Sequence, residues 1–175
     1  MGYRQIFIFI EGDKDEIFFS KIIKPLFEKR YSYVRLWKYA EVSKAKIHSF
    51  IESIRAMDAD YIFVTDINNS PCVTAKKKKI KKMIKNIDID RIVVVRKEIE
   101  GWCLAGLENS LCNRLRAPFK KDTNDLTKEE FNNLIPKKFD SEIDFIIEIL
   151  KSFSIETAEE RNTSFGYFIN KYRLL

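Results

Sequence analysis

The sequence has little cysteine and almost no histidine, the residues that most often form cross-links and nitrogen or sulfur metal sites. Of 175 residues, three are cysteine and only His48 is histidine. Cys72, Cys103 and Cys112 are odd in number, unrelated in spacing and without a C-x-x-C pair, so neither a disulfide framework nor a zinc site is indicated. A single histidine leaves no basis for a histidine-based metal site or a Ser-His-Asp triad. We expect reduced thiols in a cytosolic protein.

Glycine, proline and long hydrophobic runs are also scarce. Five glycines and four prolines argue against long disordered linkers. The first apolar run, from Ile6 to Ile10, stops at Glu11 and is too short for a signal-peptide core, and no segment approaches the length that spans a bilayer. The phosphate-binding patterns G-x-x-x-x-G-K-[ST] and G-x-G-x-x-G are absent, which argues against P-loop and dinucleotide-binding proteins. We predict a soluble, cytoplasmic protein that does not associate with membranes.

The chain is long enough for one domain with a buried core and a small appendage. Its formal net charge is +6 and its pI is about 9.1. This basic balance favours a polyanionic partner without proving one.

Four short apolar runs, at residues 3–10, 33–37, 61–65 and 91–95, are rich in β-branched and aromatic residues, as in strands buried on both faces of a parallel sheet. Apolar residues recur at helical spacing between these runs, although Pro25 should bend or shorten the first helix. These residues are Ile17, Phe18, Ile22 and Phe27; Ile47, Phe50, Ile51 and Ile54; Ile80, Met83, Ile84 and Ile87. The β-α-β-α-β-α-β order predicts an α/β fold with an open, mostly parallel four-stranded sheet flanked by helices.

After Arg96 only helical patterns follow, at residues 98–108, 127–135, 141–153 and 164–172. Thr127 with Glu130 fits a capping box, and Asp140 is expected to cap the next helix. Residues 117–124, polar with one proline, are the best boundary candidate. We therefore predict an α/β core over residues 1–108 and a helical C-terminal extension over residues 109–175.

Two of the predicted strands end in an acidic residue. Glu11 follows the first strand, and Gly12 lets the chain turn sharply after it; Asp66 ends the third strand. Ligands bind at the carboxyl ends of strands in such sheets. If the two strands are neighbours, the two carboxylates converge, and a proton, a basic group or a metal ion must relieve their repulsion. Oxygen ligands of this kind suit Mg²⁺ or Mn²⁺.

Each acid also has a local interpretation. A single strand-end aspartate such as Asp66 can cap a turn through its side chain. Asp13 and Glu16 fall in the first turn of the predicted helix, where the helix dipole favours acids, and capping is the preferred interpretation for these two.

The pattern E-G-x-x-D after an apolar strand (Glu11, Gly12, Asp15), followed about fifty residues later by D-x-N (Asp66, Asn68), resembles the Toprim domain. Topoisomerases, bacterial-type primases, small RNA-maturing nucleases and OLD-family endonucleases share this domain, whose pattern is a glutamate on the first strand and D-x-D on the third. The resemblance covers residues 3–108. It implies a compact, Rossmann-like sheet-and-helix fold that binds one or two divalent ions.

The resemblance also implies roles for single residues. Glu11 would be the general acid/base or the first metal ligand, Asp66 a metal ligand, and Asp15 a ligand of a second ion. Asn68 departs from the pattern because it replaces the second aspartate of D-x-D. The substitution removes one negative charge and should weaken divalent binding, although an amide oxygen can still coordinate.

A further acidic stretch, K-E-I-E-G-W-C-L-A-G at residues 97–106, resembles the I-E-x-W stretch of small stand-alone Toprim proteins. Glu98 or Glu100 could add a metal-binding carboxylate, and Glu100 is the better candidate. An acid in the first turn of a helix is an equally good interpretation of Glu100. Trp102 and Leu104 are expected in the core.

The helix after Asp66 carries seven lysines within K-K-K-K-I-K-K-M-I-K, residues 76–85. Such a run is usually the solvated face of an amphipathic helix, but it begins near the predicted metal site, where a phosphate backbone would need positive charge. The two interpretations are evenly balanced. The predicted nucleic-acid contacts are Lys76, Lys77, Lys78, Lys79, Lys81 and Lys82.

Three functions remain open. The first is a Mg²⁺- or Mn²⁺-dependent Toprim nuclease with Glu11 and Asp66 as catalytic residues, because the chain has no room for the extra domains of topoisomerases and primases. The second is a non-catalytic module that binds nucleic acid, a nucleotide or a partner protein, with a homodimer left open. The third, a receiver-like phosphoacceptor domain, is disfavoured because helices replace the expected fifth strand and Pro71 is displaced.

Overall fold

The computed structural model describes residues 3–117 and 120–174, which fall into two compact units divided between Val94 and Val95. Among the described residues, no helix is long and apolar enough to cross a membrane.

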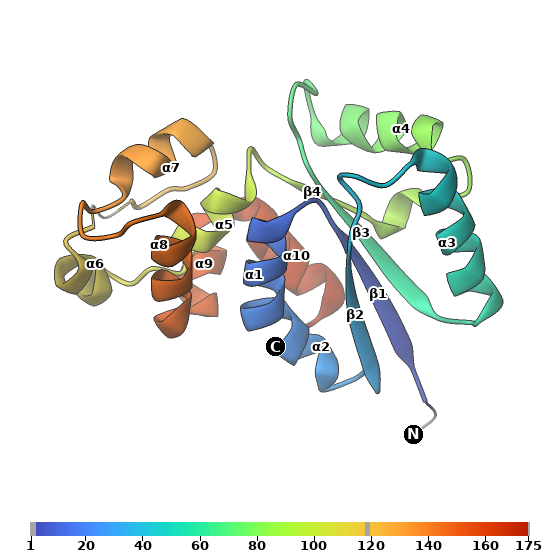
Figure 1. Cartoon of the computed structure of the whole chain (residues 1–175), viewed down its shortest axis with the longest axis horizontal. Helices are drawn as coiled ribbons and strands as arrows, with labels where there is room; N and C mark the ends of the chain where they lie inside the picture. The colour runs from blue at the N-terminus through green and yellow to red at the C-terminus, as the bar shows by residue number, and fades with distance from the viewer. Residues whose placement is uncertain (1–2, 118–119, 175) are drawn as a thin grey trace. The chain divides into compact units, whose positions relative to one another are not determined.

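The first unit contains a four-stranded sheet in the order β2-β1-β3-β4 (Figure 1). Strand β1 (Gln5–Ile10) pairs in parallel with β2 (Tyr33–Lys38) on one side and with β3 (Asp60–Asp66) on the other, and β4 (Ile92–Val95) lies beside β3. The inner position of β1 explains its unbroken apolar run, since Ile6 to Ile10 are all at most 4% exposed. The predicted α/β fold with a mostly parallel sheet is confirmed.

Helices α3 (Lys44–Ala56) and α4 (Val73–Met83) cover one face of this sheet (Figure 1). Their apolar stripes pack against the side chains that alternate strand residues present on that face. Phe50 of α3 is typical, because its ring lies 5.4 Å from that of Phe7 and 4.8 Å from that of Trp37. The core of this face comprises Phe7, Phe9, Ile47, Ile51, Ile54, Tyr61, Phe63, Ile80, Ile84, Ile87, Ile92 and Val94.

The first helical segment lies on the other side of the sheet, and it continues past Pro25 without interruption but with a change of helix type before it (Figure 1). It runs as α1 (Asp13–Phe18), a π-helical turn over Phe19–Ile23, and α2 (Lys24–Glu28). Pro25 has no amide hydrogen to continue the α-helical ladder, and the hydrogen-bond pattern changes in the turn before it.

The second unit is helical after β4. Its helices are α5 (Ile99–Ala105), α6 (Asn109–Leu115), α7 (Lys128–Leu134), α8 (Glu142–Ile149), α9 (Ile155–Arg161) and α10 (Thr163–Tyr172). The capping box at Thr127 is confirmed, because its amide donates to Glu130 Oε2 and its hydroxyl accepts from the Glu130 amide. The expectation for Asp140 is wrong: Ser141 caps α8 by accepting from the Asp144 amide.

The division between the units differs from the sequence-based boundary after residue 108. Helix α5, which we had placed in the core, packs against α7, α8 and α9 and so belongs to the second unit. Within the boundary candidate at residues 117–124, residues 118–119 lie outside the described residues. Thr123 and Asn124 are buried and bonded to Asn162 and Thr163, so they do not form an exposed linker.

Candidate functional site

The two strands that end near Glu11 and Asp66 are neighbours in the sheet, as a shared acidic site requires. Strands β1 and β3 are parallel neighbours, with Phe9 opposite Phe63. Glu11 follows the last residue of β1, and Asp66 is the last residue of β3. If the register continued by two residues, Glu11 would stand level with Thr65, one place before Asp66. Both carboxylates therefore belong to the carboxyl edge of the sheet, where parallel sheets bind ligands.

Glu11 opens into a pocket of about 160 Å³ on the side of α3 and α4. Side chains alternate along a strand, so Glu11 shares the face of Phe7 and Phe9. The pocket brings Glu11 together with Asn68 and Lys76, and its remaining lining is Tyr39, Lys44, Ile47, Phe63, Thr65, Ile80, Met83 and Ile84. Within the described part of the chain, Glu11 Oε2 is buried and accepts no hydrogen bond. A buried carboxylate oxygen without a donor is costly unless a cation is close to it.

Tyr39, which the sequence reasoning missed, marks the centre of the acidic edge. Its hydroxyl donates to the Val64 carbonyl oxygen at 2.9 Å, and its ring stacks on Phe63 with centroids 4.5 Å apart. Burial raises the pKa of Tyr39, and the negative charges of Glu11, Asp15 and Asp66 raise it further. All three acids are thus within electrostatic reach of one phenol.

The acids after Glu11 have local structural partners. Asp15 is only 7% exposed, and its Oδ2 accepts a 3.2 Å hydrogen bond from the Gly12 amide, which holds the turn between β1 and α1. Asp13 and Glu16 each pair with the Lys38 ammonium at 2.8 Å. Both lie in the first turn of α1, where the helix dipole favours acids, but the side chain that caps the helix is that of Asp15.

Asn68 adopts a left-handed backbone conformation with φ of 49°. Asparagine is among the few residues other than glycine that enter this region readily. The backbone at this position therefore suits asparagine and aspartate alike, and it does not explain why asparagine stands where the Toprim pattern has aspartate. Its side chain is exposed and lines the pocket of Glu11.

The lysines of α4 do not all face solvent. Lys78, Lys79, Lys81 and Lys82 are exposed and Lys77 is partly buried, but Lys76 is only 6% exposed and lines the pocket of Glu11. Lys76 stands one helical turn before Ile80, on the stripe that faces the core. It is therefore not part of the exposed basic strip to which the sequence assigned it.

The donor set at the acidic edge is small. Among residues 3–117 and 120–174, no three histidine, cysteine, aspartate or glutamate side chains are grouped closely enough to hold a metal ion. Of the predicted ligands, Glu11 and Asn68 line one pocket together with Thr65, whereas Asp66 does not line it and, as the residue after Thr65, starts on the opposite face of the strand. A carboxylate and an amide are oxygen donors of the kind that Mg²⁺ accepts alongside several waters. Glu11 Oε2, buried and without a hydrogen-bond donor among the described residues, is the atom that best fits a cation.

Glu98 and Glu100 belong to the second unit, whereas Glu11 belongs to the first. Glu98 precedes α5, and burial together with the charge of Glu100 raises its pKa. Glu100 lies in the first turn of α5 and is 4% exposed. Trp102 and Leu104 are buried in the core, as expected.

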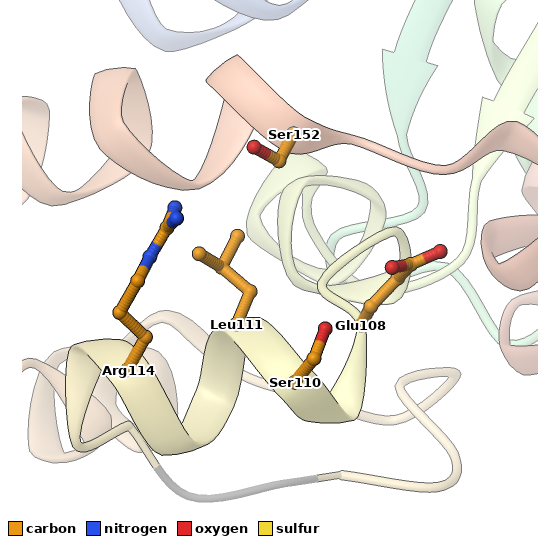
Figure 2. A pocket seen from close by; sticks show the side chains of 5 residues that line it. All are labelled: Glu108, Ser110, Leu111, Arg114 and Ser152. Atoms are coloured by element: carbon orange, nitrogen blue, oxygen red, sulfur yellow. The ribbon is translucent and has the colours of Figure 1, made fainter.

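The second unit has a pocket of its own, of about 330 Å³. Figure 2 shows Ser110, Leu111 and Arg114 projecting from α6 toward the segment that carries Ser152, with Glu108 at the start of the helix. Its charged residues, Glu108 and Arg114, are both exposed. The pocket contains no buried charged group comparable with Glu11 or Lys76.

No protein-family model and no curated protein matches this chain. Among solved structures, the chain is similar to the C-terminal region of the Burkholderia pseudomallei OLD protein. The TM-score is 0.43 and the identity 11%, over 99% of this chain and 97% of that one. A similarity of this size establishes neither family membership nor activity.

Proposed function

We propose that the protein is a metal-dependent phosphodiester hydrolase of Toprim type that acts on DNA or RNA. The observation that carries the proposal is Glu11 Oε2 at the carboxyl end of β1, which is buried and accepts no hydrogen bond among the described residues, while Asp66 ends the neighbouring parallel strand β3. Asn68 lines the same pocket as Glu11, and α4 begins after the loop that Asp66 opens and bears the exposed lysines.

In this proposal Glu11 and Asp66 hold the ion, and Asn68 offers a neutral oxygen. When bound, Mg²⁺ or Mn²⁺ would supply an activated water and neutralise charge on the leaving oxygen. If Glu11 were not itself a ligand of the ion, it would instead act as the general base that accepts the proton of the attacking water. The exposed lysines of α4 would hold the phosphate backbone, supplying affinity but no base recognition. Asp15 would act by fixing the turn after Glu11 or by contributing to a second ion.

Glu11→Gln and Asp66→Asn test the proposal because they remove a charge with little change in shape. We expect the wild type to cleave at least one of three substrates, single-stranded DNA, double-stranded DNA or RNA, when Mg²⁺ or Mn²⁺ is present and not in EDTA. Each variant should lose about 100-fold or more of that activity. The measurement is product formation on labelled oligonucleotides of the three kinds, after circular dichroism has confirmed that each variant folds.

The matched control is Glu52→Gln, an exposed carboxylate on α3 that does not line the pocket. It should cleave like the wild type. Activity that persists in EDTA, or that survives both Glu11→Gln and Asp66→Asn, would rule out the proposed site.

A non-catalytic binding module is the second candidate, and two observations favour it. Asn68 removes a charge from the donor set, and no group of three metal-binding side chains of the usual kinds occurs in the described chain. Such a module would bind nucleic acid, a nucleotide or a partner protein. Salt-sensitive binding of nucleic acid that is identical in Mg²⁺ and EDTA, with no cleavage of any substrate, would select this candidate.

A further inference from the structure

Lys76 is a charged side chain in an unusual place. It is 6% exposed, whereas the exposed lysines of α4 point to solvent. It lines the pocket that Glu11 also lines, and the negative charges of both Glu11 and Asp66 act on it. Few lysines are fully buried without a charged partner, because the cost of removing the ammonium from water must be offset.

Glu11 has a matching requirement. Its Oε2 is buried without a hydrogen-bond donor among the described residues, and a buried carboxylate needs a positive charge nearby. Burial lowers the pKa of Lys76 below its usual value and the charge of Lys79 adds to this effect, whereas the charges of Glu11 and Asp66 partly offset it.

We propose that the Lys76 ammonium is the resident counter-ion of Glu11, and that a divalent ion entering this edge of the sheet must compete with it. Lys76 thereby stabilises the folded acidic edge in the absence of metal, and it lowers the affinity of that edge for divalent ions. The stabilising role does not depend on any metal, whereas the competition with divalent ions rests on the proposed metal-dependent function.

A double-mutant cycle tests the stabilising role without any metal. We would measure unfolding by urea in EDTA for the wild type, Lys76→Met, Glu11→Gln and the double variant. Methionine keeps the length and apolar stem of the lysine but not its charge. If Lys76 neutralises Glu11, the double variant is more stable than the sum of the single effects predicts, since its lost charges no longer leave an unpaired partner.

Manganese binding, followed by the electron paramagnetic resonance signal of free Mn²⁺, tests the competition with divalent ions. Removing a competing positive charge should tighten the binding of Mn²⁺ to Lys76→Met about tenfold or more. Lys76→Arg keeps the charge and should bind Mn²⁺ as weakly as the wild type. The control is Lys85→Met, which removes an exposed lysine beyond α4 and should leave Mn²⁺ binding unchanged.

The outcomes separate the two proposals. Additive effects in the cycle would overturn the counter-ion role of Lys76, even if the wild type cleaves nucleic acid. Coupling in the cycle together with no Mn²⁺ binding to any variant would uphold that role and count against the metal-dependent function. Weaker Mn²⁺ binding by Lys76→Met would overturn the competition. Should Lys76→Met fail to fold alone, its rescue by Glu11→Gln would itself support the pairing.

Discussion

Asn68 has a positive φ, which asparagine adopts readily. It occupies the position of the second aspartate in the Toprim D-x-D pattern. Asn68→Asp adds one carboxylate to the acidic edge, and aspartate also tolerates a positive φ. Under the proposed function, we expect Asn68→Asp to bind Mn²⁺ several-fold more tightly and to cleave at lower metal concentration. Metal titrations of binding and of cleavage measure this effect.

The control for this prediction is Asn69→Asp, one residue further along the same exposed loop. It adds the same charge but does not line the pocket of Glu11. Equal tightening by both variants would show that a general increase in negative charge, and no specific ligand, accounts for the effect.

Residues differ in how far the sequence predicts their place. Glu11 and Asp66 could be found because each ends an apolar run, and strand ends meet at one edge. Lys76 was misplaced among the exposed lysines, although its spacing of four residues from Ile80 carried the signal of an inward side chain. Tyr39 gave no such signal, because an aromatic residue after a strand is usually core, and only the neighbouring charges reveal its place in the site.

At the scale of elements, a charged cluster ties together the starts of the strands. The carboxylate of Asp60, the first residue of β3, accepts two hydrogen bonds from residues that precede other strands. The Arg91 guanidinium before β4 donates at 2.8 Å, and the Tyr31 hydroxyl before β2 donates at 2.9 Å. Asp60 also pairs with Arg4 before β1 at 3.1 Å. Burial of the Asp60 carboxylate opposes its ionisation, but the bonds from Arg91 and Tyr31 and the charge of Arg91 outweigh it, so its pKa lies below the usual value.

We therefore expect Asp60→Asn to reduce the free energy of unfolding at pH 7 by about 1.5–3 kcal/mol, the usual range for hydrogen bonds to charged groups. A lowered pKa means that this stabilisation is fully present above the unfolded value of about 3.9 and is lost as the pH falls through the folded value. The difference from wild type should thus stay constant from pH 7 to about pH 5 and shrink as the pH falls below about 4. Urea unfolding at several pH values measures it.

Asp58→Asn is the control, because Asp58 is exposed two residues before Asp60 and has φ of 51°, which asparagine tolerates. It should change stability little at any pH. A pH-independent loss in Asp60→Asn would mean that its charge does not hold the strand starts together.

The elements themselves were predicted unequally. The four strands were found within a few residues of their ends, because β-branched and aromatic runs between turns carry a strong pattern. Helices α6 and α9, which were missed, have only seven residues each, too few for a helical period to repeat, and they lack a capping box like the one at Thr127 that marked the equally short α7. Pro25 predicted a bend or a shortening of the first helix, but the π-helical turn depends on packing that a sequence does not display.

At the scale of the whole molecule, the division of the chain depends on contacts between residues far apart in sequence. Helix α5 follows the last strand directly, so its sequence position suggested the core, but its partners are α7, α8 and α9. Likewise, polar composition suggested a linker at Thr123 and Asn124, yet their polar groups are bonded inside the second unit. Composition cannot distinguish a solvated polar segment from one whose hydrogen bonds are internal.

The net charge of +6 has its densest source on α4, and this predicts how any nucleic-acid binding depends on salt. Exposed lysines release counterions from the phosphate backbone, so affinity should fall steeply with ionic strength. In the triple variant Lys78→Gln, Lys79→Gln and Lys82→Gln, we expect weaker binding and a slope of log affinity against log salt that is reduced by up to about 3. Fluorescence anisotropy in EDTA, with no cleavage, measures both.

The matched control changes the same net charge elsewhere. Lys121→Gln, Lys137→Gln and Lys138→Gln remove three exposed lysines of the second unit. If α4 holds the phosphate backbone, this variant keeps most of the affinity and nearly the full slope, because three contacts to phosphate remain. If both triple variants lose the same affinity and slope, the basic character of the whole surface attracts nucleic acid, and α4 is only the solvated face of a helix.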